Sequence, residues 1–135
     1  MKYVILALYP LLMMLSDCFG MAHMPPTEEQ FLIRIDSIAH PASIRYDDSL
    51  TILLYGTIGA DSCTVFSHID ETKKPLDVEL TVWGKHYLDS TCATRMIALN
   101  GRQYKTLTNM TGWFKIHIRQ PDGTMLTDSL FSHGY

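Results

Sequence analysis

Apolar and polar residues alternate with a period of two along most of the chain after residue 30. In the segment 78–83, VELTVW, the residues Val78, Leu80 and Val82 fall on one side of a strand, and Trp83 falls on the other with the polar residues. A strand with one dry face and one wet face is typical of a sheet that covers a core on one side only.

The sequence WFKIHIR, at 113–119, repeats this pattern. Its apolar face holds Phe114 and two isoleucines, and its polar face holds Trp113 and His117. Turn residues recur at short intervals between such segments, which is typical of an all-β chain. We expect seven or eight strands, at 31–38, 49–58, 63–69, 78–83, 93–99, 103–108, 113–119 and 124–131.

Turn chemistry fits this division. Asn100-Gly101 predicts a two-residue hairpin, because both central residues of a type I′ turn need positive φ. Pro121-Asp122-Gly123 predicts a type I turn closed by a glycine bulge. The polar segment 70–77 is expected to be a loop.

No segment of ten or more residues carries a helical apolar stripe, so parallel βαβ units are excluded. The pattern favours an all-β fold, an antiparallel β-sandwich of immunoglobulin-like or fibronectin-like type. A closed barrel is the alternative.

The N-terminal residues have the composition of a signal peptide. Lys2 supplies a positive charge, and Tyr3 to Leu15 is an uncharged apolar run too short to span a bilayer. We therefore expect residues 1–18 to be a signal peptide and the chain to be exported.

Two cleavage sites are compatible with this leader. The sequence LSDC resembles a bacterial lipobox, in which Cys18 would carry lipid and anchor the protein to a membrane, although Asp17 departs from the small residue that lipoboxes favour. Gly20-Met21-Ala22 instead permits ordinary cleavage after Ala22. The stretch after Cys18 lacks acidic residues, so we expect an anchored protein to face the periplasm.

Either cleavage removes Cys18 from the pool of free thiols and leaves Cys63 and Cys92. An even pair of cysteines in an exported chain predicts a disulfide.

The rest of the chain has the size of one domain. Residues 19–30 have the composition of a linker, and 31–135 form the expected β-sandwich domain. The formal net charge is -3 and no basic run occurs. Nucleic acid is therefore not expected as a partner.

Several short motifs carry a resemblance: YGTIG with Cys63 and Phe66, LTVWGK, Cys92, LNG before Tyr104, and QPDG. Together they resemble a group of small uncharacterised exported β-sandwich proteins and lipoproteins of Bacteroidetes bacteria. The resemblance implies an envelope β-sandwich with paired cysteines and implies no reaction.

Candidate chemistry is sparse. The six histidines show no spacing of a known metal site, and no cofactor is expected. His68 and Asp70 share a strand face from which Glu71 is turned away. Gly56 and Gly59 lack a following helix, so a turn or a close backbone approach explains them better than phosphate binding. No nucleophile motif is found, and we expect a protein that is not an enzyme.

The residues that remain favour binding. Trp83 and Trp113 fall on the polar side of their strands, His117 shares the face of Trp113, and Tyr104 can join them if its hairpin lies alongside. We expect these four residues to bind a ligand in a cell-envelope binding or adhesion module for a glycan, a peptide or a protein partner. The alternative is a structural accessory subunit or spacer, in which the two tryptophans cap the core.

Overall fold

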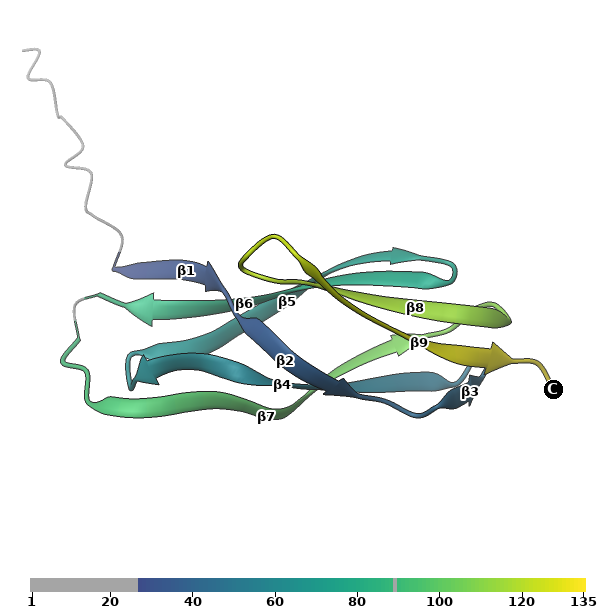
Figure 1. Cartoon of the computed structure of the whole chain (residues 1–135), viewed down its shortest axis with the longest axis horizontal. Helices are drawn as coiled ribbons and strands as arrows, with labels where there is room; N and C mark the ends of the chain where they lie inside the picture. Colours follow the sequence, from purple (N-terminus) through teal and green to yellow (C-terminus); the bar gives the residue numbers. More distant parts are fainter. Residues whose placement is uncertain (1–26, 89) are drawn as a thin grey trace, which may run out of the picture.

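The computed structural model describes residues 27–88 and 90–135, and the chain there is all-β (Figure 1). The signal peptide with Cys18 and Ala22, and most of the linker, lie outside the described residues. Nine strands form in this part of the chain: β1 (Glu28–Leu32), β2 (Arg34–Ala39), β3 (Ser43–Arg45), β4 (Ser49–Asp61), β5 (Thr64–Lys74), β6 (Asp77–Tyr87), β7 (Thr94–Leu107), β8 (Gly112–Arg119) and β9 (Met125–His133).

The strands form two sheets. The smaller sheet has the order β2-β4-β7. In the larger one, β6 pairs with β5 along one edge and with β8 and β1 along the other, and β9 and β3 continue the sheet beyond β8. Described residues contain no helix that is long and apolar enough to cross a membrane.

The core lies between the sheets, where the alternating pattern places it. Val78, Leu80 and Val82 of β6 are fully buried, as are Phe114, Ile116 and Ile118 of β8. Leu50, Ile52 and Leu54 of β4 cover them from the opposite sheet. The predicted dry faces are therefore confirmed, and so is the sandwich-like two-sheet architecture.

The first strand differs from its prediction. It begins at Glu28, so that Glu28–Gln30 of the expected linker belong to β1, and it breaks at Ile33. On the two sides of the break the chain pairs with different sheets, β1 with β6 and β2 with β4. Ile33 is buried at this crossing and donates its amide to the carbonyl of Val82. The break is invisible in the pattern because Ile33 and Ile35 keep the same alternation.

The prediction of a hairpin at Asn100-Gly101 was wrong. Both expected strands are one continuous strand, β7, which pairs with β4 over its whole length. Gly101, with φ +74°, is an extra residue between the pairs Tyr55–Asn100 and Leu54–Arg102. A glycine bulge needs the same positive φ as the hairpin, so the dipeptide fits both.

Of the other two predicted connections, one is wrong and one is confirmed. The polar segment 70–77 is not a loop, because β5 extends to Lys74 and β6 begins at Asp77, leaving Pro75-Leu76 as a tight turn. The turn at Pro121-Asp122-Gly123 is confirmed: the Gly123 amide donates to the carbonyl of Gln120, and Gly123 has φ +83°.

The expected all-antiparallel pairing was also wrong in two places. β6 runs parallel to β8, and β3 runs parallel to β9. β3 has three residues, too few for an alternating pattern, and was absent from the expected strands. A pattern with a period of two residues indicates which face of a strand is buried, but it does not indicate the direction of the neighbouring strand.

Candidate functional site

The structure places three of the four expected binding residues on the outer face of the larger sheet. Trp83 lies on β6, and Trp113 and His117 lie on β8. Tyr104 lies on β7 in the smaller sheet. The two tryptophans thus lie on the strand faces that were expected, whereas Tyr104 lies in the other sheet and does not join them.

Trp113 is an exposed aromatic residue. Its side chain is 62% exposed and meets Phe131 of β9 edge-on, with 5.5 Å between the ring centroids. Trp113 and Phe131 are directly paired across the two strands. The alternative in which Trp113 caps the core is therefore wrong.

Trp83 is half-buried and engaged by its own sheet. The indole Nε1–H donates to Oδ2 of Asp70 at 2.8 Å, and the ring stacks on His68 of β5 with centroids 6.2 Å apart. His68 also pairs with Asp70, while Glu71 points elsewhere, as expected from the alternation. Trp83 is thus held in place on the polar face and does not enter the core.

The two tryptophans are far apart. In the parallel pairing of β6 with β8, Asp77 lies opposite Lys115. Trp113 is two positions before that pair and Trp83 is six positions after it. Eight steps at about 3.3 Å per residue separate the indoles by about 26 Å along the strands. One small ligand cannot contact both.

His117 lies between them in a polar network. Its Nε2 is 3.1 Å from Oδ2 of Asp77, and its Nδ1 is 3.0 Å from Oγ1 of Thr127. Next to it, Arg119 donates to Glu79 at 2.5 Å. With both ring nitrogens bonded within the protein, His117 acts as part of the surface network.

Tyr104 closes one side of the sandwich. Its hydroxyl donates to a carboxylate oxygen of Glu71 on β5, so this bond links the smaller sheet to the larger one. Burial is the main cause that raises the pKa of Tyr104. Arg102, two residues earlier on β7, covers the ring of Phe66 at 3.9 Å. Both side chains therefore hold the sheets together.

Further aromatic residues lie near Trp113, and sequence reasoning missed them. Phe131 and Ser43 are neighbours across β9 and β3, and Arg45 follows on the same face of β3. The guanidinium of Arg45 lies 4.6 Å from the centroid of the Tyr135 ring. We call Trp113, Phe131, Arg45 and Tyr135 the aromatic end surface. Phe131 could have been found from the sequence, because it directly follows Leu130 in a strand and therefore falls on the opposite, outer face.

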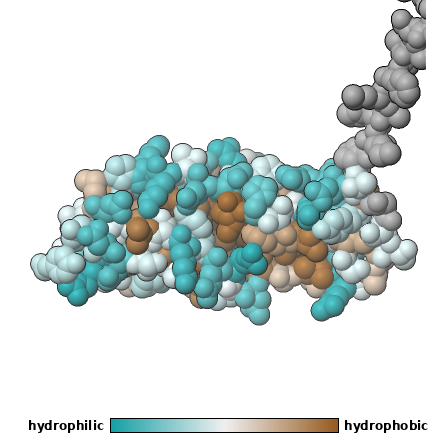
Figure 2. Space-filling model, turned by 180° about the vertical axis from the view of Figure 1, so that it is seen from behind, coloured by the Kyte–Doolittle hydropathy of each residue, from teal (hydrophilic) through white to brown (hydrophobic). Residues whose placement is uncertain are grey.

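Apolar surface elsewhere is scattered. Figure 2 shows that on the reverse face hydrophobic residues occur in separate patches bordered by hydrophilic ones. Within the described residues the exposed large hydrophobic side chains are Leu88, Met96, Leu107, Met110, Trp113, Met125, Phe131 and Tyr135. Single exposed residues need no functional explanation, whereas a contiguous group does.

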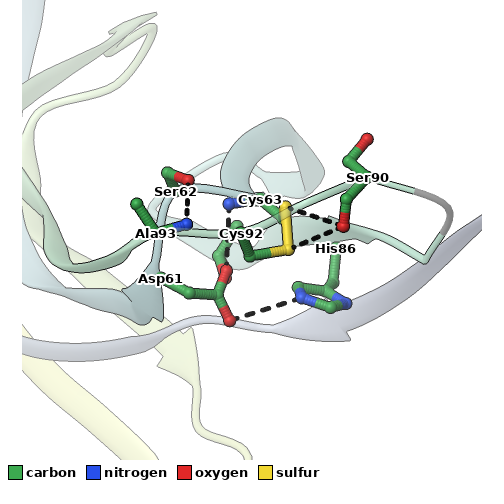
Figure 3. Close-up of a disulfide and its surroundings, with 8 residues drawn as sticks. Asp61, Ser62, Cys63, His86, Ser90, Cys92 and Ala93 are labelled. Atoms are coloured by element: carbon green, nitrogen blue, oxygen red, sulfur yellow. Dashed lines mark hydrogen bonds and ion pairs between the residues drawn. A yellow bond between two sulfur atoms is a disulfide. The ribbon is translucent and has the colours of Figure 1, made fainter.

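The disulfide lies at the other end of the molecule. Cys63, just after β4, is bonded to Cys92, just before β7, with 5.3 Å between the Cα atoms. This confirms the expected pairing. Asp61 and His86 lie beside the bond, as Figure 3 shows, and both sulfurs face the carbonyl of Ser90.

The chain matches no protein-family model, no curated protein and no solved structure at a significant level.

Proposed function

We propose that the chain is a cell-envelope binding or adhesion module that recognises a glycan, a peptide or a protein partner through the aromatic end surface. The observation that carries this proposal is the pair of Trp113 and Phe131, which leaves two large rings in contact with water, 62% and 41% exposed. Contiguous exposed rings are typical of recognition surfaces, where Trp offers a broad apolar area with one N–H donor.

The neighbouring residues fit the same role. The guanidinium of Arg45 lies over the ring of Tyr135, and Arg45 is two positions from Ser43, the β3 neighbour of Phe131. Aromatic faces stack on sugar rings or fill a pocket of a protein, and a guanidinium donates several hydrogen bonds to hydroxyl or carbonyl oxygens. This chemistry suits a ligand with apolar faces and many acceptors.

The alternative function is a structural subunit or spacer in an envelope assembly. The observation that favours it is the long strand β7, Thr94–Leu107, which among the described residues pairs with β4 alone. An unpaired strand edge offers a row of amide and carbonyl groups to another chain.

The proposal includes export by the leader at residues 1–18 and a lipid anchor at Cys18 facing the periplasm. The Cys63–Cys92 disulfide supports export, because disulfides persist in oxidising compartments. Labelled palmitate should mark the wild-type protein and leave Cys18→Ser unlabelled. Equal labelling of both, or a mature N-terminus at His23, contradicts the anchor.

A binding screen tests the function. The purified protein is presented to an array of envelope oligosaccharides and to immobilised envelope peptides, and each hit is repeated with Trp113→Ala and Phe131→Ala. Both variants should lose binding. Leu107→Ala is the matched control, because Leu107 is also exposed, at 50%, but lies on the smaller sheet. Binding that survives both aromatic substitutions contradicts the proposal and leaves the structural subunit.

A further inference from the structure

Three side chains with metal-binding chemistry, Asp61, His86 and Cys92, meet at the disulfide, and Cys63 is joined to them through its bond to Cys92 (Figure 3). Nε2 of His86 lies 3.3 Å from Oδ2 of Asp61. One ligand atom from each of Asp61, His86 and Cys92 lies within 4.8 Å of the others, and Cys63 adds a second sulfur through its bond to Cys92. Two sulfurs, one imidazole and one carboxylate form a donor set that suits zinc.

The surrounding strands hold the two ligands that are not sulfur. His86 is paired with Thr64 of β5 on one side and with Glu29 of β1 on the other. Oδ1 of Asp61 accepts from the amide of Cys63 at 3.0 Å and from the hydroxyl of Thr64 at 2.8 Å, which leaves Oδ2 directed at His86. The Thr64 hydrogen bond is the main cause that lowers the pKa of Asp61. Such outer contacts orient metal ligands in known sites.

The spacing of the imidazole and carboxylate atoms agrees with tetrahedral coordination. Zinc binds nitrogen and oxygen at about 2.0–2.2 Å, so two such ligands of one ion lie about 3.4 Å apart. The observed separation of Nε2 and Oδ2 is 3.3 Å. Asp61 and His86 are half-buried and Cys92 is exposed, so an ion can reach the site from solvent.

We propose that reduction of the Cys63–Cys92 disulfide converts this cluster into a zinc site with Cys63, Cys92, His86 and Asp61 as ligands. An external dithiol supplies two electrons and two protons and is itself oxidised to a disulfide. The S–S bond between Cys63 and Cys92 breaks, and both residues become thiols. Zn²⁺ then displaces the two thiol protons to solvent and binds both thiolates. The disulfide and the metal are therefore mutually exclusive ways to tie the end of β4 to the start of β7.

Cobalt spectroscopy on the full chain tests this site. Every variant carries Cys18→Ser, so that Cys63 and Cys92 are its two cysteines. After reduction with a phosphine, Co²⁺ should give thiolate charge-transfer and tetrahedral bands at one equivalent, and Zn²⁺ should remove them. The oxidised protein should give neither. His86→Asn and Asp61→Asn should each weaken binding by about 10-fold or more.

His68→Asn is the matched control, because His68 also pairs with an aspartate, Asp70, at a separation of 3.6 Å, but both residues lie within β5 and no cysteine is nearby. It should leave Co²⁺ affinity unchanged. Equal binding by oxidised and reduced protein overturns the proposal, as does reduced-state binding that is insensitive to both His86→Asn and Asp61→Asn. If the reduced chain unfolds, Zn²⁺ must restore a cooperative urea transition, which Cys63→Ser with Cys92→Ser must lack. Failure of that restoration also overturns the site.

Discussion

The carbonyl oxygen of Arg34 lies where a side chain at Gly56 would begin. Ile35 of β2 is paired with Gly56 of β4, and the register shifts by one residue directly after this pair. The backbones approach so closely here that a Cβ at position 56 would overlap the oxygen. Gly56 is thus explained by the close backbone approach that its position in a strand predicted.

We therefore expect Gly56→Ala to lower the free energy of unfolding by about 1–3 kcal/mol, because the backbone of Arg34 cannot move aside as a flexible side chain can. Urea denaturation measures this change. Gly134→Ala is the control, since its Cβ would meet Thr111 at 3.6 Å, an ordinary contact, and it should change stability by less than about 0.5 kcal/mol. Equal effects of the two substitutions would contradict the close approach.

The disulfide gives a second prediction. It closes a loop with a sequence separation of 29 residues, and in the chain-entropy model such a link stabilises the fold by about 3–4 kcal/mol. Cys63→Ser with Cys92→Ser should lower the free energy of unfolding by this amount. Alkylation of unreduced protein should modify neither cysteine, and mass spectrometry reads the result. Two alkylated thiols in protein isolated from the periplasm would refute the pairing in the cell.

Those parts of the fold that depend on burial could be predicted from the sequence. The dry faces of β6 and β8 follow from alternation, because each apolar residue there is fully buried. The crossing at Ile33 and the bulge at Gly101 could not, because they change the pairing partner or the register without changing the alternation. Short β3 carries too few residues to give a pattern.

The candidate site shows the same limit. Alternation correctly put Trp83 and Trp113 on the outer face, since a face depends only on residue parity. It could not show that they lie about 26 Å apart, because that distance depends on the register between β6 and β8. It likewise could not show that Tyr104 belongs to the other sheet, because the hairpin that would have brought it near is a bulge.

Trp113 and Phe114 give a third prediction, because they are neighbours in the chain with opposite environments. Trp113 is 62% exposed and Phe114 is fully buried. Phe114→Ala should cost about 3–5 kcal/mol of unfolding free energy. Trp113→Ala loses the contact with Phe131 and should cost about 0.5–1.5 kcal/mol. Thermal and urea unfolding of both variants measure this difference. A cost at Trp113 as large as that at Phe114 would show that the indole is buried, and would remove the basis of the aromatic end surface.

The last prediction concerns acid. Asp122 lies in the turn between β8 and β9, where its Oδ1 accepts from the hydroxyl of Thr124 at 2.6 Å and from the amide of Thr124 at 2.9 Å. The hydroxyl bond is the main cause that lowers the pKa of Asp122 below its ordinary value of 3.8, and the amide bond adds to it. A carboxyl whose folded pKa is depressed stabilises the fold above its unfolded pKa, and this contribution is lost as pH falls through the folded pKa.

Asp122→Asn keeps an oxygen acceptor for Thr124 but cannot titrate. We expect the variant to be less stable than the wild type at neutral pH, and we expect the gap to close as pH falls from about 7 to about 2. Asp61 and Asp128 have pKa values lowered in the same direction, so both proteins should lose stability over this range, the wild type more steeply. Urea midpoints taken at intervals across this range give the two curves. A gap that stays constant down to the lowest pH would mean that the charge of Asp122 contributes nothing, and that the turn is held by Gly123 and by backbone hydrogen bonds alone.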